Sequence, residues 1–275
     1  MRVHDVSSSP ITLSTGSPQG CVLSPLLFTL LTHDCSARHP SCLIVKYADD
    51  TAVVGCITNN DESNYRQEVV QLERWCRDNN LCINAKKTKE MIVDFRKGRH
   101  LPPPLHIEGT AVEVVSSFRY LGVHIANDLS WSTNTACLIK KAHQRLYFLR
   151  RLRHAGLGSS VLSSFYRCVV ESVLSSCINV WHGSCSAAEK KALQRVVKAA
   201  QRTVGRNLPS TTDVYKARCR KRASCIMEDP THPSHTLFVP LPSGRRLRSI
   251  KSRTTRLRNS FFPEAVRLLN SGGSR

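Results

Sequence analysis

The distribution of apolar residues predicts two regions of different structure. Short apolar runs at residues 43–45 and 51–57 are rich in β-branched side chains and are separated by a polar stretch. This pattern predicts two strands joined by a tight turn. After Trp131 the apolar positions instead recur every three or four residues, in stripes at 139–152, 161–174 and 193–200. That spacing predicts helices.

Further helices are predicted by the same spacing and by end signals. The apolar segment 22–31 is helix-compatible, and we expect its leucines to pack in a core: Leu26, Leu27, Leu30 and Leu31. A stripe at intervals of four, three and four residues predicts a second helix: Tyr65, Val69, Leu72 and Cys76. Ser186 followed by Glu189 forms a capping box, which predicts that a helix begins there.

These patterns predict an α+β fold with three regions. We expect a strand-containing region at 1–130, an all-α region at 131–207 and a basic C-terminal region at 208–275. The last region is rich in Pro, Ser and Arg, and we expect it to be partly disordered.

The turn between the two predicted strands carries candidate chemistry. Its residues are Tyr47, Ala48, Asp49 and Asp50. Two adjacent carboxylates repel each other, so an exposed pair of this kind favours a bound cation over a purely structural role. Hard divalent cations take carboxylate oxygens as ligands. The alternative is a solvated polar turn.

A second block upstream gives the pair a context. Residues 14–28 read Ser-Thr-Gly-Ser-Pro-Gln-Gly-Cys-Val-Leu-Ser-Pro-Leu-Leu-Phe. Together with the acid pair, this block resembles the palm of reverse transcriptases from non-LTR (LINE-type) retrotransposons. The resemblance implies an RNA template, a DNA primer and deoxynucleoside triphosphates as partners. It also implies two-metal nucleotidyl transfer with Mg²⁺ or Mn²⁺.

The resemblance assigns roles to individual residues. Asp49 and Asp50 would be catalytic metal ligands, with Tyr47 and Ala48 facing the primer end. Residues of the upstream block would approach nucleic acid or nucleotide: Gly16, Pro18, Gln19 and Gly20. Residues 84–95 resemble the loop and strand that follow in the family, where Lys87 or Lys89 would approach the triphosphate; the alternative is a solvated basic turn. Residues 118–125 resemble the next family motif, a strand that supports the primer, and the helical region resembles the thumb.

The family's metal site needs one more carboxylate, from a strand before the Pro-Gln-Gly block. Asp5 is the single acid in residues 1–13, and its neighbours do not resemble that strand. We therefore expect an incomplete palm, weak metal binding and no polymerase activity from this chain alone. The alternative function is a non-catalytic protein that still binds RNA or DNA.

Charge supports a nucleic-acid partner. The chain has 275 residues, a formal charge of +20 and a pI near 9.9, which favour a polyanion. Seven bases and no acid lie between 245 and 258: Arg245, Arg246, Arg248, Lys251, Arg253, Arg256 and Arg258. They predict a nucleic-acid-binding arm, with a solvated tail as the alternative. From the residues of this sequence we expect neither a membrane-spanning stretch nor a secretory signal. We expect an intracellular protein, in the cytoplasm or nucleus, without a membrane partner.

The twelve cysteines are scattered, which favours reduced thiols over disulfides. One set has a spacing that resembles a zinc site loosely: Cys219, Cys225, His232 and His235. The alternative is a simple turn. The segment near 130–206 is also similar to the amino-terminal domain of AlkB homologue eight. That similarity would imply an oxygenase or methyltransferase, but the chain lacks the His-x-Asp motif of iron oxygenases.

Overall fold

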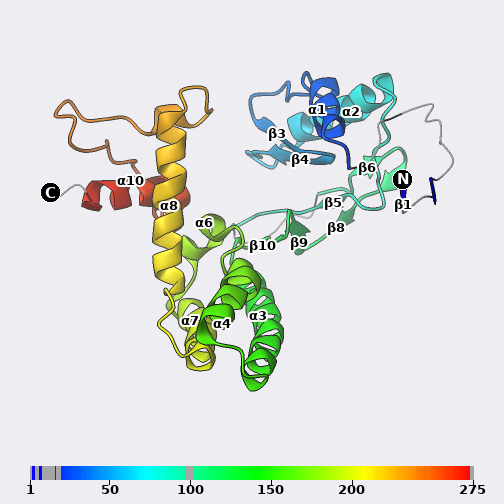
Figure 1. Ribbon diagram of the computed structural model, residues 1–275. Coiled ribbons are helices and arrows are strands. Elements are labelled where there is room, and N and C mark those ends of the chain that lie inside the picture. Colours follow the sequence, from blue (N-terminus) through cyan, green and yellow to red (C-terminus); the bar gives the residue numbers. More distant parts are fainter. Residues whose placement is uncertain (1, 4–5, 8–15, 17–19, 97–101, 273–275) are drawn as a thin grey trace. The chain divides into compact units, whose positions relative to one another are not determined.

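The computed structural model describes residues 2–3, 6–7, 16, 20–96 and 102–272. The chain divides into two compact units (Figure 1). The first comprises Met1–Glu90 and Arg96–Val114, and the second comprises Met91–Phe95 and Val115–Arg275. The helical region and the region after 208 therefore belong to one unit.

The first unit combines helices with short strand pairs. The central pair is the antiparallel hairpin of β3 and β4, which contacts helix α2. A small core lies beside α2 and contains Val69, Leu105, Ile107 and Val112. The elements are β1 (Arg2–Val3), β2 (Val6–Ser7), α1 (Leu23–Leu31), β3 (Cys42–Tyr47), β4 (Asp50–Gly55), α2 (Ser63–Asp78), β5 (Lys89–Glu90), β6 (His106–Ile107), β7 (Thr110–Ala111) and β8 (Glu113–Val114).

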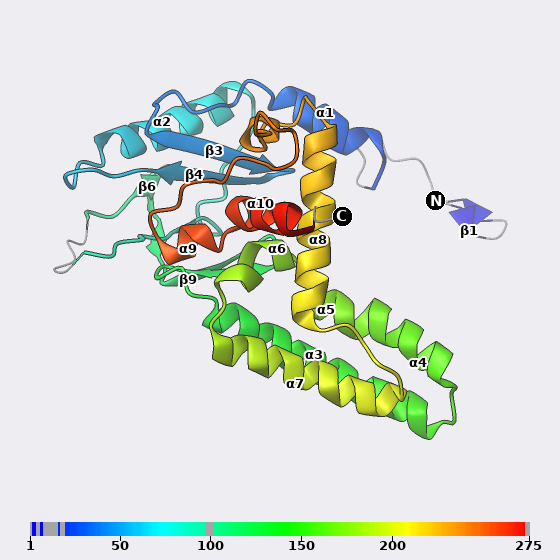
Figure 2. The same ribbon diagram turned by 90° about the vertical axis from the view of Figure 1, so that its left-hand side faces the viewer.

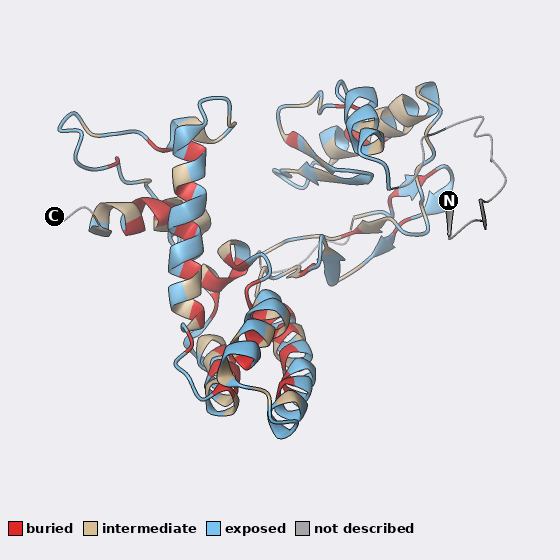
Figure 3. Cartoon of the chain, in the orientation of Figure 1, coloured by how far each residue is buried: buried red, intermediate tan, exposed pale blue. Residues whose placement is uncertain are grey.

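Helix α1 forms where the sequence predicts it, but its predicted burial is wrong. No residue of α1 is buried (Figure 3), and four of its leucines are 46–58% exposed: Leu26, Leu27, Leu30 and Leu31. The apolar side chains favour a helix locally, whereas burial requires a second surface. Within the described residues, no element covers this helix.

The second unit begins with a hairpin and continues as helices. Its elements are β9 (Ser117–Tyr120), β10 (Val123–Ala126), α3 (Ser132–His154), α4 (Ser159–Phe165), the π-helix η1 (Tyr166–Glu171), α5 (Ser172–Leu174), α6 (Ile178–Trp181), η2 (His182–Ser184), α7 (Ala187–Val204), α8 (Thr211–Glu228), η3 (His235–Leu237), α9 (Thr255–Arg258) and α10 (Phe261–Gly272). Residues 118–125, predicted as one strand, form two because Leu121 and Gly122 both adopt positive φ in a turn. Residues 91–95, also predicted as a strand, have no regular structure.

The core of the second unit is built from the predicted stripes. Ala142, Leu146 and Leu149 of α3 are completely buried against Leu193 and Val197 of α7 and their neighbours. Helices α3 and α7 lie side by side (Figure 2). At their amino-terminal ends, the Thr135 hydroxyl donates to the Glu189 carboxylate over 3.1 Å. Glu189 also completes the capping box that the sequence predicts with Ser186.

The expectation of a partly disordered region after 208 is corrected by helix α8. Helix α8 begins with a second capping box, between Ser210 and Asp213, and buries Tyr215 and Cys219 in the main core. Ala223 and Ile226, further along α8, pack with α10 in a smaller core. Burial of the apolar side chains on one face of α8 thus stabilises the helix despite its many Lys and Arg residues.

Candidate metal hairpin and nucleic-acid interface

The acid pair lies at the tip of the predicted hairpin. Strands β3 and β4 are antiparallel, with Tyr47 opposite Asp50, so Ala48 and Asp49 form a two-residue turn. Ala48 has φ +51°, a conformation that costs a non-glycine residue about 1–2 kcal/mol. A two-residue hairpin turn needs a positive φ at its first position. The surrounding strands therefore hold the turn in a strained form.

Both carboxylates are open to solvent and free of internal cations. Asp49 and Asp50 are exposed, and neither side chain forms an ion pair or hydrogen bond with any residue that the structure describes. An arginine packed against the pair would give it a structural explanation. Among the described residues, no arginine forms an ion pair with either carboxylate. Two adjacent carboxylates in this setting can ligate a hard cation.

Tyr47 and Asp50 project from the same face of the hairpin, because directly paired residues do so. Tyr47 is 64% exposed, and the same face carries Leu43 and Val45, which are also exposed. The opposite face is covered by α2: a side chain at Gly55 would meet Tyr65 at 2.9 Å. The outward face thus presents an aromatic ring beside the acid pair.

A buried carboxylate anchors the hairpin to its unit. Glu68 of α2 is 1% exposed and accepts hydrogen bonds from the backbone amides of Arg38 (3.1 and 3.2 Å) and His39 (3.1 Å). These amides precede β3 in the chain. On the strand itself, the Lys46 ammonium donates to the Thr32 carbonyl. Glu68 carries no signal in the sequence, since a lone acid on a helix does not indicate burial.

The upstream block is described only in part. Pro18 and Gln19 lie outside the described residues, so their predicted roles stay predictions; Asp5 lies outside them as well. Gly16 and Gly20 have φ of +79° and +83°, which favours glycine at both positions. Next to Gly20, hydrogen bonds from Ser24 lower the pKa of the exposed Cys21 thiol.

The two candidate lysines have different surroundings. Lys89 forms an ion pair with Glu113 at 2.5 Å, where β5 runs parallel to β8. Lys87 is exposed, and its backbone amide donates to Asn84 in a turn. Its ammonium forms no ion pair within the described residues. Lys87 is therefore the freer of the two for a phosphate.

The proposed zinc ligands do not assemble. Among the described residues, no group of three His, Cys, Asp or Glu side chains could hold a metal ion. Burial raises the pKa of the Cys219 thiol to about 11, which disfavours the thiolate that zinc requires. Cys225 is exposed, and the ring Nδ1 of His235 lies 3.1 Å from the Ile226 carbonyl. The same finding leaves the hairpin with two carboxylates and no third ligand in this part of the chain.

The basic segment after 240 is held in place by its backbone. Leu247 is buried, its amide donates to the Asn270 side chain at 2.8 Å, and its carbonyl accepts from the same side chain at 3.0 Å. The neighbouring bases point to solvent: Arg245, Arg246, Arg248, Lys251 and Arg253 are all exposed. Arg256 has a structural role, since it donates to the Asp128 carbonyl at 3.0 Å and lies 5.1 Å from the Phe95 ring centre.

A second basic surface lies at the carboxyl-terminal end of α7. An open groove of about 520 Å³ is lined by Lys198, Gln201, Arg202, Gly205, Arg206 and Asn207. None of its three cations forms an ion pair within the described residues. Cations also stabilise the carboxyl end of a helix, so the groove has a structural explanation beside a phosphate-binding one.

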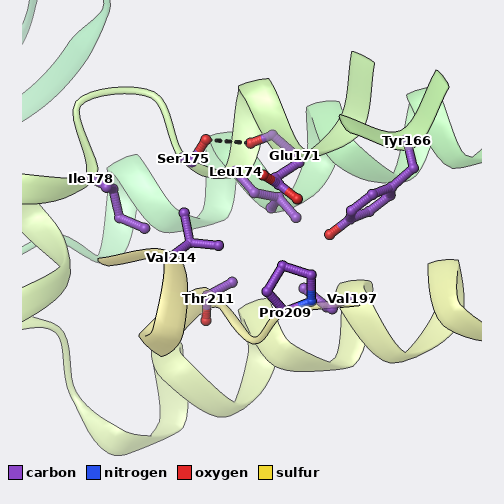
Figure 4. Close-up of a pocket in the computed structure, with 9 residues that line it drawn as sticks. All are labelled: Tyr166, Glu171, Leu174, Ser175, Ile178, Val197, Pro209, Thr211 and Val214. Atoms are coloured by element: carbon purple, nitrogen blue, oxygen red, sulfur yellow. Dashed lines mark hydrogen bonds between the residues drawn. The ribbon is translucent and has the colours of Figure 1, made fainter. Parts of the chain in front are cut away.

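A pocket in the second unit is too small for a substrate. It lies among η1, α5, α7 and α8 and holds about 10 Å³ (Figure 4), room for about one water molecule. Glu171 Oε2 is buried without a hydrogen-bond partner, while the Glu171 carbonyl accepts from the Ser175 hydroxyl at 2.6 Å.

No single helix in the described chain is long and apolar enough to span a membrane. Only the bent pair Ser159–Leu174 and Ile178–Ser184, at 42°, passes that test together.

Comparison with known proteins finds that the hairpin lies in a segment similar to reverse transcriptases. Residues 2–125, which contain the acid pair, match the family model described as reverse transcriptase (RNA-dependent DNA polymerase). The chain resembles retrotransposon reverse transcriptases. It is 28% identical over 162 residues to the probable RNA-directed DNA polymerase from transposon BS of Drosophila melanogaster, covering 55% of this chain and 18% of that protein.

Two further relatives extend the similarity. The probable RNA-directed DNA polymerase from transposon X-element of Drosophila melanogaster is 26% identical, over 75% of this chain and 23% of its own length. The polymerase from mobile element jockey of the same species is 27% identical, over 48% of this chain and 15% of its own length. The chain thus spans about a fifth of the length of the reverse transcriptases it matches. No solved structure matches it.

A second family model covers part of the helical region. Residues 131–172, which form α3, α4 and η1, match the model for alkylated DNA repair protein alkB homolog 8, N-terminal. An iron oxygenase needs two histidines and a carboxylate around one metal. Among the described residues no such group is present, so the match concerns helices and brings no oxygenase site with it.

Proposed function

We propose that this chain is one part of an RNA-directed DNA polymerase of the non-LTR (LINE-type) kind. The observation that carries the proposal is the Asp49–Asp50 pair, exposed and free of internal cations at a strained hairpin tip, within the segment that matches reverse transcriptases. The first unit would act as an incomplete palm and the helices of the second unit as the thumb.

In this proposal Asp49 and Asp50 hold Mg²⁺ or Mn²⁺. The fit is partial, because two carboxylates suit a hard cation but the described residues offer no third ligand. Such ions, when bound, stabilise the attacking and leaving oxygens of nucleotidyl transfer. Tyr47 would contact the primer end, and Lys87 would attract the triphosphate. Exposed Lys and Arg side chains of both units would bind template and primer phosphates.

The second candidate function is nucleic-acid binding without catalysis. The observation that favours it is the number of Lys and Arg side chains open to a partner. They lie in the α7 groove and at Arg245, Arg246, Arg248, Lys251 and Arg253. These would bind RNA or DNA backbones even with an incomplete metal site. Such binding weakens steeply with salt because bound counterions are released.

A primer-extension assay separates the two functions. The full chain is given oligo(dT) annealed to poly(rA), with dTTP and Mg²⁺. We expect binding without extension, which supports the second function, nucleic-acid binding without catalysis by this chain. Extension that is abolished in Asp49→Ala would support a complete polymerase site. Extension that persists in Asp49→Ala, or no binding of the template–primer, would contradict the proposal.

A further inference from the structure

Helix α3 carries two aromatic rings that the core does not use. Tyr147 and Phe148 are each 56% exposed, and their rings form an edge-to-face pair with centres 5.5 Å apart. The buried side of α3 consists instead of Ala142, Leu146 and Leu149. Exposed aromatic rings order the water around them, and no packing contact offsets that cost. A pair of such rings therefore indicates a contact surface.

The residues around the rings share one face of the helix. Lys140, Gln144, Tyr147 and Arg151 follow one another at intervals of four, three and four residues, and Phe148 lies beside them. We call these five residues the outer α3 face. All five are exposed, and the helical spacing places them on the side opposite the buried residues.

The charge of this face has one sign. The sequence of α3 contains no acid, and its cations form no ion pair within the described residues: Lys140, Lys141, Arg145, Arg150, Arg151 and Arg153. Only those near the last turn are explained by the helix dipole. Lys141 and Arg145 lie four residues apart in the middle of the helix, where like charges at this spacing destabilise it. An anionic partner would remove that repulsion.

We infer that the outer α3 face binds single-stranded nucleic acid by stacking unpaired bases on Tyr147 and Phe148. The flat rings offer surfaces for bases, and the flanking Lys140 and Arg151 offer contacts for the phosphates on either side. A paired duplex hides its base faces, so this surface selects single strands. The inference rests on the proposed function only for the class of partner.

An anionic membrane is the competing partner for aromatic and basic side chains. Helices that lie on membranes insert a wide apolar face. The wide apolar face of α3 is buried in the protein core, and on the outer α3 face the two rings are flanked by Gln144 and cations. Base stacking requires only this small aromatic pair, which favours nucleic acid.

The test measures how the full chain binds two labelled strands, oligothymidylate and an abasic strand of equal length. EDTA is present, so the result does not depend on the hairpin metal. We expect Tyr147→Ala/Phe148→Ala to weaken binding of oligothymidylate about tenfold and to leave binding of the abasic strand unchanged. Tyr147→Trp/Phe148→Trp should retain tight binding of oligothymidylate. The control Val161→Ala/Val180→Ala, which removes exposed apolar side chains elsewhere in this unit, should match the parent on both strands.

The cations are tested by their salt dependence. Lys140→Gln/Arg151→Gln should weaken binding of both strands and reduce the slope of log K against log salt by about 1.4. An equal loss on both strands, or no loss, in the aromatic double variant would overturn the inference. So would loss of binding to phosphatidylserine vesicles in that variant while oligothymidylate binding is unchanged. These results would leave the polymerase proposal standing, because it is tested by Asp49→Ala.

Discussion

Tyr47 and Asp50 face each other across the β3–β4 hairpin, so the turn between them consists only of Ala48 and Asp49. This pairing fixes the acid pair at the tip and sets the tyrosine ring beside it. The tightness of the turn is also what forces Ala48 to a positive φ. Strain of this kind persists where the surrounding structure holds it, and it is concentrated at functional sites.

The strain at Ala48 can be measured by substitution. Ala48→Gly should stabilise the hairpin by about 1 kcal/mol, because glycine adopts this φ without a steric cost. Ala48→Val should destabilise it by more than that, since a β-branched residue tolerates positive φ least. Amide hydrogen exchange across β3 and β4 measures both effects. Slower exchange in Ala48→Val than in the parent would contradict the strained turn.

The hairpin should also depend on Glu68. Glu68→Gln keeps the size of the side chain but replaces the carboxylate that accepts from the Arg38 and His39 amides. Bonds to a charged acceptor contribute about 1.5–3 kcal/mol each. We expect the first unit to lose about 2 kcal/mol in urea unfolding. Asp78→Asn, an exposed position on the same helix, is the control. Equal stability of the two variants would show that Glu68 is not an anchor.

The second unit should lose stability in acid through His182. This histidine is 1% exposed, and neither ring nitrogen has a hydrogen-bond partner among the described residues. Burial, aided by the Lys190 charge, lowers the pKa of His182 from 6.5 to about 4. The unfolded chain therefore binds a proton more readily than the folded one. Stability is complete above pH 6.5 and falls by up to about 3 kcal/mol as the pH drops to 4.

The variant His182→Phe tests this dependence. Phenylalanine retains the stacking on Tyr215, whose ring centre lies 4.7 Å away, but cannot be protonated. Calorimetric unfolding at pH 7 and pH 5 should show a smaller loss for His182→Phe than for the parent. His154→Gln, an exposed histidine of α3, should behave like the parent. A parent-like loss in His182→Phe would exclude this histidine as the cause.

The sequence predicts elements whose signals are local. The β3–β4 hairpin follows from β-branched runs around a short polar turn, and the stripe of Ala142, Leu146 and Leu149 indicates the buried side of α3. The same stripe leaves Tyr147 and Phe148 outside, so their exposure could have been predicted. The many Lys and Arg residues of α8 favour a tail in the sequence, although Ser210 and Asp213 form a capping signal for a helix.

The predictions that failed depend on contacts between distant residues. The leucines of α1 have the composition of a core helix, but burial depends on a covering surface that α1 itself cannot specify. The zinc set failed because Cys219 faces the helical core while Cys225 faces solvent. Cys219 and Cys225 are six residues apart on α8, a spacing that puts their side chains on different faces of the helix.

The central claim is that the hairpin carboxylates bind a divalent metal. Titration of the full chain with Mn²⁺ alone, followed by electron paramagnetic resonance of the free ion, measures this binding directly. We predict weak binding in the parent, a further loss on the order of tenfold or more in Asp49→Asn, and no change in the control Asp78→Asn. Binding that is equal in the parent and Asp49→Asn would contradict the account.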